Sequence, residues 1–483
     1  MGEAPASFDA RPVGDLICPE PDQRPDIWPW SAKRLDNGVL EIGGVSLTDL
    51  ADDFATPAFV LDRADLAGRA NVWATAMAEE FWDGYGMNGG DAFYAGKAFL
   101  SSDVVRVVTD AGMGVDTASL GEMTMALRSG ANPAKVGLHG NNKLDSEIEC
   151  ALLAGNKEGI ERIFIDSLYE VGQVERIAKK LGVIARVMVR VKTGVHAGGN
   201  EYISTGHEDQ KFGVGAFDGQ LDEVVDAIAS SDHLELRGLH SHIGSQIIGI
   251  DAFVEAATII CRLAKQIQGR TGLTIPDIDL GGGAGVAYTG DDETPTSPIE
   301  VARAIAGAVR DACAELDFPV PHVSVEPGRS VVGPAMVSLY RVGAVKDATL
   351  GDGLKRRYIA VDGGMADNIR PALYGARYTA TLANRVSDVE PVRSRIVGKH
   401  CESGDVIVWD VDLPSDVQAG DLLVIPVTGA YGYSMASNYN MATKPGVIAV
   451  ESGQASWIMR PQTIDDLLEL DTGLASLAVA NEE

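Results

Sequence analysis

The sequence predicts an α/β protein, in which a (β/α)8 barrel is followed by a second, mainly antiparallel β domain. Three observations predict this architecture. Eight short apolar runs alternate with stretches of helical length between residues 62 and 330. Nearly every one of these runs ends in a residue capable of chemistry, and β-rich segments replace the alternation after about residue 331. A chain of 483 residues is also long enough for two domains.

The eight predicted barrel strands are apolar and rich in β-branched residues, and segments of helical periodicity separate most of them. The strands are expected within residues 92–99, 114–119, 135–140, 162–167, 185–191, 236–245, 277–285 and 322–329. This is the strand count of a (β/α)8 barrel. A doubly wound sheet has the same alternation and remains an alternative, because strand order cannot be read from one sequence.

Polar residues at the ends of the predicted strands favour the barrel. They are Lys97, Asp116, His139, Asp166, Arg190, His242, Gly281 to Gly283, Glu326 and Arg329. In a barrel the carboxyl ends of all eight strands meet at one mouth, where the active site lies. One such residue would be explained by a polar cap on a strand leaving the core, but a succession of eight indicates a shared site.

The remainder of the chain reads as a β-rich domain with turn signals between its strands. Its predicted strands lie within residues 335–345, 356–364, 392–398, 405–411, 421–429 and 446–450. Two N-terminal segments, 38–47 and 57–62, have no place in the barrel count and are assigned to the same domain. The predicted domains are therefore 62–330 for the barrel, and 1–61 with 331–483 for a discontinuous β-barrel or sandwich. The loops 196–210 and 289–298 either cover the mouth or face solvent.

Composition excludes several classes of partner. The formal charge of −29 argues against nucleic acid and anionic membranes, which both select basic surfaces. No apolar run is long enough to span a bilayer, and the N-terminus has no signal-peptide pattern. The five cysteines lack CxxC spacing, so neither a disulfide framework nor a metal site is expected. We therefore expect a soluble cytoplasmic protein.

A glycine-rich turn predicts a phosphate site at the mouth. The segment GGGAG at 281–285 follows an apolar strand directly, and glycines let backbone N–H groups approach a phosphate closely. Ser245 would add a hydroxyl and Arg329 a cation. These donors indicate a cofactor that carries a phosphate.

Lys97 and Glu326 extend this prediction to a specific cofactor. A lysine surrounded by apolar and aromatic residues can form a Schiff base, although a solvated lysine at a strand end is the simpler reading for one residue alone. A carboxylate such as Glu326 can keep a pyridine nitrogen protonated, and His242 can stack on the ring. Pyridoxal 5'-phosphate requires this set of groups at one barrel mouth: a lysine, a carboxylate, a histidine and a phosphate-binding site.

Nine ordered motifs resemble those of the diaminopimelate decarboxylases. The motifs are FYAGKAF (93–99), VDTASLGE (115–122), HGNNK (139–143), HSHIGSQ (240–246), LGGGAG (280–285), EPGR (326–329), RPALYGARY (370–378), CESGD (401–405) and GAYGYSMASNYN (429–440). The family belongs to the alanine-racemase-like, fold-type III group of enzymes that use pyridoxal phosphate. The resemblance covers about residues 55 to 450, and the segment 192–214 is similar to the actinobacterial form. The first 40 residues carry little of it.

The resemblance implies a role for each motif residue. Lys97 would bond covalently to the cofactor, Glu326 would meet its pyridine nitrogen, and His242 would stack on its ring. The other cofactor-binding residues would be Ser245, Gly281, Gly282, Gly283, Gly328, Arg329 and Tyr431. The substrate would be bound by Arg329, Arg370, Tyr374, Glu402 and Tyr431, of which the arginines and Tyr374 take the distal carboxylate and Glu402 the distal ammonium.

Cys401 would supply the proton that replaces CO2, and in this family the cysteine segment comes from the partner subunit of a homodimer. The implied reaction converts meso-2,6-diaminopimelate to L-lysine and CO2, the last step of lysine biosynthesis. An ornithine or arginine decarboxylase would need no pocket for a distal carboxylate, and an alanine racemase would lack the CESGD block. A non-catalytic regulator of the same fold is expected to lose Lys97 or Cys401, and both are present.

Overall fold

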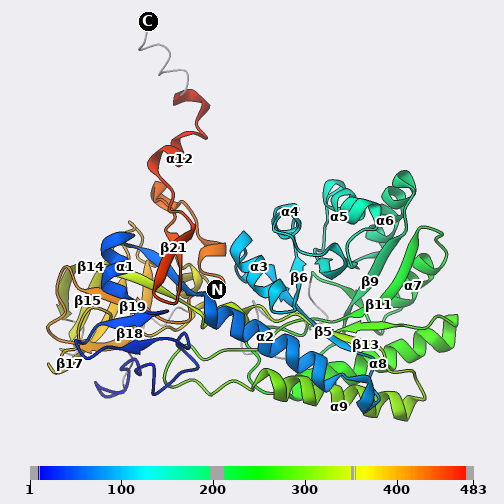
Figure 1. The fold of residues 1–483 in the computed structure, drawn as a ribbon, viewed down its shortest axis with the longest axis horizontal. Helices are drawn as coiled ribbons and strands as arrows, with labels where there is room; N and C mark the ends of the chain where they lie inside the picture. Colours follow the sequence, from blue (N-terminus) through cyan, green and yellow to red (C-terminus); the bar gives the residue numbers. More distant parts are fainter. Residues whose placement is uncertain (1–8, 10, 196–210, 350–352, 354, 475–483) are drawn as a thin grey trace, which may run out of the picture. The chain divides into compact units, whose positions relative to one another are not determined.

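The computed structural model describes residues 9, 11–195, 211–349, 353 and 355–474. The chain divides into two compact units (Figure 1). The barrel unit contains Leu66–Val286 and Glu293–Val331, and the β unit contains Met1–Asp65, Ala287–Asp292 and Val332–Glu483. The sequence pattern did not indicate that Ala287–Asp292, inside the predicted barrel range, groups with the β unit. The predicted loop 196–210 lies outside the described residues.

The barrel unit is a closed ring of eight parallel strands. These are β5 (Gly90–Ala95), β6 (Gly114–Thr117), β7 (Val136–Leu138), β8 (Arg162–Ile165), β9 (Ala185–Lys192), β11 (Leu234–His240), β12 (Asp277–Asp279) and β13 (His322–Val325). Each strand pairs with the next in parallel, and β13 pairs with β5 to close the ring. The short β10 (Val214–Gly215) adds to β9. The prediction of a (β/α)8 barrel is confirmed, and the doubly wound sheet is wrong.

One helix precedes the first barrel strand, and the others follow the barrel strands in the expected alternation. They are α2 (Arg63–Glu80), α3 (Ser102–Asp110), α4 (Leu120–Arg128), α5 (Asp145–Lys157), α6 (Leu168–Leu181), α7 (Gln220–Ala229), α8 (Asp251–Thr271), α9 (Pro298–Leu316) and the single turn α10 (Arg329–Val332). Serine caps set where four of them begin, because a serine oxygen accepts an otherwise unpaired N–H of the first turn. These caps are Ser101, Ser119, Ser167 and Ser297.

The β unit is built on one large, mainly antiparallel sheet in the order β18–β17–β15–β14–β4–β20–β21. Its strands are β4 (Ala58–Asp62), β14 (Met336–Thr349), β15 (Lys355–Val361), β17 (Pro391–Val397), β18 (Val406–Pro414), β20 (Gly446–Glu451) and β21 (Gln454–Met459). β19 (Leu422–Ile425) pairs with β14 and with β16 (Thr381–Leu382). Only the pairs β15–β17 and β4–β20 of this sheet are parallel in the described chain.

The two N-terminal segments both lie in the β unit but form different sheets. Segment 57–62 forms β4 and joins the large sheet. Segment 38–47 instead forms β2 (Leu40–Ile42) and β3 (Val45–Ser46), which make a separate sheet with β1 (Lys33–Arg34). The remaining helices of the unit are α1 (Leu47–Asp53), α11 (Arg370–Tyr374) and α12 (Ile464–Leu468).

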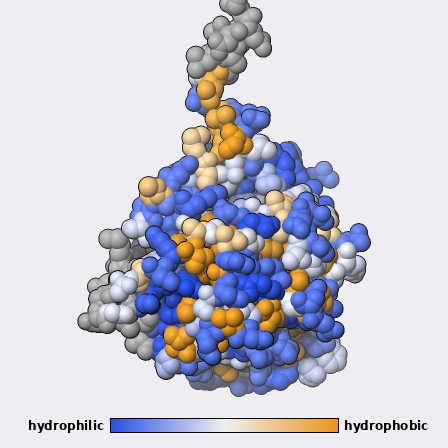
Figure 2. Space-filling model, turned by 90° about the vertical axis from the view of Figure 1, so that its left-hand side faces the viewer, coloured by the Kyte–Doolittle hydropathy of each residue, from blue (hydrophilic) through white to orange (hydrophobic). Residues whose placement is uncertain are grey.

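The face of the molecule in Figure 2 is mainly hydrophilic. Hydrophobic side chains form small groups on this face. Within the described residues, no helix combines the length and apolar character needed to cross a membrane.

Candidate active site

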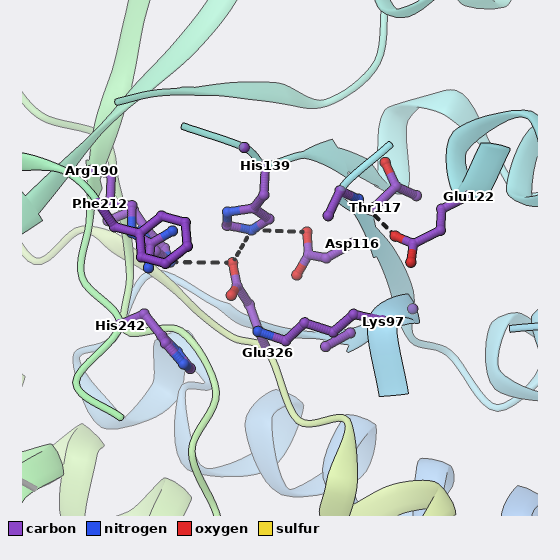
Figure 3. Close-up of a pocket in the computed structure, with 14 residues that line it drawn as sticks. Lys97, Asp116, Thr117, Glu122, His139, Arg190, Phe212, His242 and Glu326 are labelled. Carbon is purple, nitrogen blue, oxygen red and sulfur yellow. Dashed lines mark hydrogen bonds and ion pairs between the residues drawn. The ribbon is translucent and has the colours of Figure 1, made fainter. Parts of the chain in front are cut away.

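Lys97 stands at the carboxyl end of the first barrel strand. β5 ends at Ala95, and a single 3-10 turn, Gly96–Ala98, carries the lysine into a pocket (Figure 3). The turn lies close to the neighbouring strand, because a Cβ on Gly96 would lie 2.9 Å from the carbonyl oxygen of Asp116. Ala98 and Phe99 are buried beyond it. A rigid apolar support therefore holds the amine at the barrel mouth.

The pocket gathers most of the polar strand ends that the sequence predicted. Its charged and polar lining side chains are Lys97, Asp116, Thr117, Glu122, His139, Arg190, His240, His242 and Glu326, with Phe212 beside them. They come from the ends of six of the eight strands and from the segments that follow (Figure 3). Three of the predicted strand ends are not among the lining residues: Asp166, the glycines at 281–283 and Arg329. The N–H of Asp166 donates to Glu170 Oε2 at the start of α6.

Glu326 is the centre of a buried hydrogen-bonded group. Its Oε1 lies 2.8 Å from His139 Nε2 and 3.5 Å from His240 Nε2. The His139 ring stacks on Phe164 with a centroid distance of 3.7 Å. Burial alone would raise the pKa of Glu326, but His139 and His240 outweigh it and hold the pKa well below its ordinary value. Glu326 is therefore an ionised carboxylate inside the pocket.

His139 is neutral in this arrangement. Burial lowers the pKa of His139 to about 3, against the opposing effect of Glu326. An ionised carboxylate only accepts hydrogen bonds, so the Nε2 of His139 must carry the hydrogen that it donates to Glu326. The ligand atoms of His139, His240 and Glu326 lie within 4.8 Å of one another, so the triad could also hold a divalent cation.

Two further buried carboxylates near Glu326, those of Asp116 and Asp279, have different environments. Burial, followed by repulsion from Glu326, raises the pKa of Asp116 well above its ordinary value. Asp279 pairs with Arg162, whose Nη2 lies 2.8 Å from Asp279 Oδ2. The other oxygen of Asp279 accepts the N–H of Gly281 at 2.7 Å. Asp279 thus fixes the start of the glycine-rich turn.

The glycines at 281–283 pack against the segment that carries His242. A Cβ would lie 2.8 Å from His242 Nδ1 at Gly281, 2.3 Å from Glu326 O at Gly282, and 2.9 Å from Gly244 O at Gly283. Gly281 and Gly283 also have φ of +66° and +126°. The N–H of Gly282 donates to His242 Nδ1 at 3.1 Å, so the turn orients the imidazole. Only glycine fits this close approach.

Ser245 lies on the loop that follows β11, Gly328 lies on the loop that follows β13, and Arg329 begins α10. Arg329 Nη2 donates to Ser245 Oγ at 3.0 Å, so the hydroxyl and the cation predicted for the phosphate site are brought together. A Cβ on Gly328 would lie 3.0 Å from the Cβ of Ala95, which places this glycine against the end of β5.

The residues of the barrel mouth fit pyridoxal phosphate. An amine, an ionised buried carboxylate and an imidazole share one pocket or its wall. The glycine turn leaves no room for side chains, and a hydroxyl paired with a guanidinium lies on the adjoining loops. Phosphate binding sites are built from such donors.

Five of the predicted site residues lie in the β unit. Arg370 begins α11 and is buried, and its guanidinium donates to the hydroxyl of Tyr378. Tyr374 ends the same helix and is half-buried. The other three are Cys401, Glu402 and Tyr431.

Cys401 and Glu402 are exposed on the turn that precedes β18. The N–H of Cys401 donates to Asn440 Oδ1 at 3.4 Å, and Glu402 Oε1 accepts the N–H of Gly404 at 3.3 Å. Tyr431 is half-buried and has a φ of +62°, which is rare for a residue with a side chain.

The pocket contains residues to which the sequence analysis gave no role. Phe212 lies under Arg190, 4.4 Å from its guanidinium carbon. Glu122 accepts the N–H of Ala118 at 2.7 Å, and burial raises the pKa of its carboxyl. His240 was predictable, because it precedes His242 by two residues and alternate residues of an extended strand share a face. Phe212 follows no barrel strand directly and offered no such signal.

Comparison with known proteins identifies the family. Residues 69–333 match the family described as "Pyridoxal-dependent decarboxylase, pyridoxal binding domain". The diaminopimelate decarboxylase of Mycobacterium tuberculosis H37Rv is 43% identical over 452 residues, which cover 92% of this chain and 98% of the relative. The chain belongs to the diaminopimelate decarboxylase family. The enzymes of this family depend on pyridoxal phosphate, so the cofactor expected from Lys97 and Glu326 is confirmed at the level of the family.

Other members of the diaminopimelate decarboxylase family agree in sequence and in fold. The Bacillus subtilis relative is 39% identical, with 91% of this chain and 97% of the relative covered. The structure of the M. jannaschii diaminopimelate decarboxylase, solved in complex with L-lysine, superposes with a TM-score of 0.83. It is 29% identical, with 91% of this chain and 97% of that chain covered.

Proposed function

We propose that this chain decarboxylates meso-2,6-diaminopimelate to L-lysine and CO2, the last step of lysine biosynthesis. The observation that carries the proposal is the shared pocket of Lys97 and Glu326 in a chain of this family. The complex of the M. jannaschii relative with L-lysine supports the same product for this chain.

The barrel residues bind the cofactor. Lys97 holds it covalently through its amine, and the ionised Glu326 keeps the proton on the ring nitrogen. Ser245, Gly328, Arg329 and the turn at 281–283 hold the phosphate group, and Tyr431 of the β unit adds to this set. When bound, pyridoxal phosphate supplies the electron sink for the carbanion that loss of CO2 leaves. His242 packs a flat imidazole against the ring, with its orientation fixed by Gly282.

The residues of the β unit select the substrate. Diaminopimelate has two amino-acid ends, so the enzyme must bind the end that does not react. Arg370 and Tyr374 of the β unit, together with Arg329 of the barrel unit, bind the distal carboxylate, because guanidinium groups form paired hydrogen bonds with carboxylates. Glu402 binds the distal ammonium. The Cys401 thiol delivers a proton to the carbon that lost CO2, which completes the product.

Cys401 and Glu402 serve the barrel of a partner subunit in this proposal. The protein is then a homodimer with two shared active sites, and it works in the cytoplasm. The exposure of both side chains supports this arrangement, because residues that complete another subunit's site must be accessible in the single chain.

A direct assay tests the proposal. Purified protein with pyridoxal phosphate is incubated with meso-diaminopimelate, and L-lysine and CO2 are measured. L-Ornithine and L-arginine are the matched controls, because both lack a distal carboxylate. The proposal expects turnover of diaminopimelate alone. Turnover of ornithine or arginine in its place would assign the chain to a basic amino acid decarboxylase, and a colourless protein that turns over none of them would be a regulator.

A further inference from the structure

The guanidinium of Arg370 packs against two tyrosine rings that also contact each other. Its central carbon lies 4.8 Å from the ring centroid of Tyr288 and 5.5 Å from that of Tyr378. The two rings meet edge to face at 5.2 Å. All three side chains are at least nine-tenths buried, with exposed fractions of 7% for Arg370, 6% for Tyr288 and 3% for Tyr378. Stacking on aromatic faces favours the charged guanidinium and restricts its rotamers.

Tyr288 belongs to the segment Ala287–Asp292, which groups with the β unit although it lies within the predicted barrel range. The segment is tightly turned, because Asp292 Oδ2 accepts the N–H groups of Tyr288 at 2.8 Å and Thr289 at 2.9 Å. Any displacement of this turn moves the ring that lies against Arg370.

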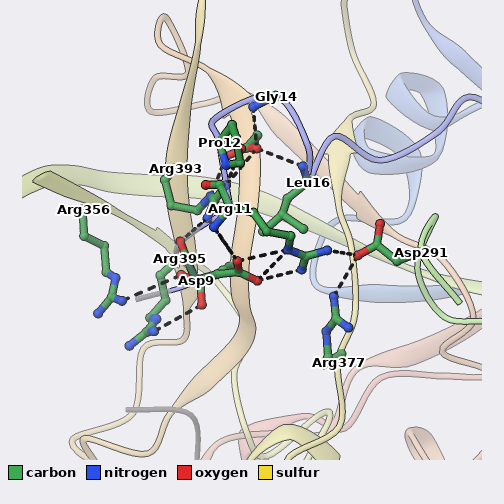
Figure 4. Close-up of polar contacts among 12 residues, drawn as sticks. Asp9, Arg11, Pro12, Gly14, Leu16, Asp291, Arg356, Arg377, Arg393 and Arg395 are labelled. Atoms are coloured by element: carbon green, nitrogen blue, oxygen red, sulfur yellow. Dashed lines mark hydrogen bonds and ion pairs between the residues drawn. The ribbon is translucent and has the colours of Figure 1, made fainter. Parts of the chain in front are cut away.

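Residues 11–28, which we call the N-terminal clasp, hold that turn. Arg24 donates to the carbonyl oxygens of Gly290 at 2.5 Å and Asp292 at 3.2 Å. Arg11 forms an ion pair with Asp291, to which Arg377 also donates at 3.2 Å (Figure 4). Arginines of the β unit thus bind residues 290–292. These residues belong to the acidic loop 289–298, for which the sequence left open a cover of the mouth or exposure to solvent.

The clasp itself is anchored on the large sheet. Arg393 of β17 pairs with Asp412 of β18 at 2.6 Å, and both side chains are buried. Asp412 Oδ2 accepts the N–H groups of Gly14 at 2.8 Å and Leu16 at 2.9 Å (Figure 4). Arg393 also donates to the carbonyl oxygen of Pro12 at 3.0 Å. This buried ion pair holds the clasp backbone in place, because loss of either partner leaves a buried charge unpaired.

We propose that the N-terminal clasp and Tyr288 position Arg370 for the distal carboxylate of the substrate. The clasp fixes the turn, the turn fixes Tyr288, and Tyr288 with Tyr378 presents Arg370 in one rotamer before the substrate arrives. An arginine that is already ordered loses less conformational freedom on binding, so its carboxylate contact is tighter. Tyr288 and Tyr378 are positioning residues, and this inference rests on the role proposed for Arg370.

Ligands with and without the distal carboxylate separate this role from general damage. L-Lysine keeps the α-carboxylate of the unreacted end, whereas cadaverine has the same chain and amines without it. The holoenzyme and its variants are compared by kcat and KM for diaminopimelate and by competitive inhibition with each ligand. The variants are Tyr288→Ala, Tyr288→Phe, and Arg11→Ala combined with Arg24→Ala. Arg303→Ala is the control, because Arg303 pairs with Glu80 on the barrel unit, away from the clasp residues in sequence and contacts.

Tyr288→Ala is expected to raise KM and the inhibition constant of L-lysine by about 10-fold, with kcat and the constant for cadaverine within about 2-fold. Tyr288→Phe keeps the ring and should stay within about 3-fold, and the double arginine variant should raise KM by about 5-fold. Equal changes for lysine and cadaverine, or an unchanged KM in the double arginine variant, would overturn the proposal. The double variant decides the matter if Tyr288→Ala does not fold.

Arg370→Lys separates this inference from the proposed function. If that variant keeps the wild-type preference for lysine over cadaverine, the role of Arg370 itself is wrong. If it loses the preference while Tyr288→Ala and the double arginine variant keep it, only the positioning by the clasp is wrong.

Discussion

His139 Nε2 lies 2.8 Å from Glu326 Oε1, and the two side chains come from opposite parts of the barrel sequence, 187 residues apart. The pair combines a neutral imidazole with an ionised carboxylate. The histidine stabilises the charge on Glu326 without cancelling it, so the carboxylate keeps its charge for a pyridine nitrogen.

His139→Phe should lower kcat by about 10-fold with little change in KM. Phenylalanine keeps a ring against Phe164 but removes the donor to Glu326, so the pKa of Glu326 rises and its hold on the ring-nitrogen proton weakens. Steady-state kinetics and the visible spectrum of the bound cofactor as a function of pH measure the effect. Glu326→Gln is the reference and should lose about 100-fold or more in kcat. An unchanged spectrum and kcat in His139→Phe would mean that His139 only fills space.

The stability of the cofactor-free protein should fall as the pH decreases from 7 towards 4. His139 has a folded pKa of about 3 against an ordinary value of 6.5, so the folded state binds fewer protons than the unfolded state in this interval. Its contribution is fully present above pH 6.5 and decreases below it by about 1.4 kcal/mol per pH unit. Thermal unfolding from pH 7 to pH 4.5 should show a shallower slope for His139→Phe. A slope identical to wild type would contradict the buried neutral histidine.

Lys97→Ala should abolish covalent attachment of the cofactor. Borohydride reduction of the wild-type holoenzyme should fix the cofactor to one peptide that contains Lys97, because this amine projects into the pocket. Mass spectrometry of the digested protein identifies the labelled peptide. Lys143→Ala serves as a comparison, since Lys143 is buried in an ion pair with Glu170 at 3.0 Å. Covalent labelling at a different lysine in Lys97→Ala would overturn the assignment.

Mixing two inactive variants should restore activity if the active site is shared. Lys97→Ala protein lacks the barrel amine, and Cys401→Ala protein lacks the exposed thiol of the β unit. A hybrid dimer holds one intact site, so about a quarter of wild-type activity is the expected ceiling for random exchange of subunits. The measurement is L-lysine production after the two proteins are unfolded and refolded together. Absence of recovery, with wild-type protein regaining activity in parallel, would place both residues in the same chain's site.

Chelation should leave the activity intact. The His139, His240 and Glu326 atoms could bind a divalent cation, but the cofactor supplies the electron sink and Glu326 is needed at the ring nitrogen. Dialysis of the holoenzyme against EDTA should therefore change kcat by less than about 2-fold. Loss of activity that Zn²⁺ restores in wild type, but not in His139→Phe, would make the triad a metal site.

The barrel strands and most of the residues at the barrel mouth were predictable, because the signal for each lies within a short stretch of sequence. Each strand is a short apolar run, and the residue that follows it must emerge at the same edge of the ring. Lys97, His139 and Glu326 were found by that rule. Asp166 obeys the same pattern but is not among the residues that line the pocket, so the rule selects positions and does not assign functions.

The arrangement around Arg370 was not predictable from local pattern. Tyr288 and Arg370 are 82 residues apart, and the segment that carries Tyr288 lies inside the predicted barrel range. The ion pair of Arg11 with Asp291 and the hydrogen bonds of Arg24 to the carbonyl oxygens of Gly290 and Asp292 span still longer separations. Such contacts depend on the completed fold, and neither periodicity nor turn residues encode them.

The pairing of Gly14 and Leu16 with Asp412 has a consequence for synthesis of the chain. The two backbone donors precede their acceptor by 398 and 396 residues. At about 5–20 residues per second, the ribosome makes residue 412 some 20 to 80 seconds after residue 14. Gly14 and Leu16 thus leave the ribosome long before the residue that accepts their hydrogen bonds. The contacts that anchor the clasp on the large sheet can form only after residue 412 has been made.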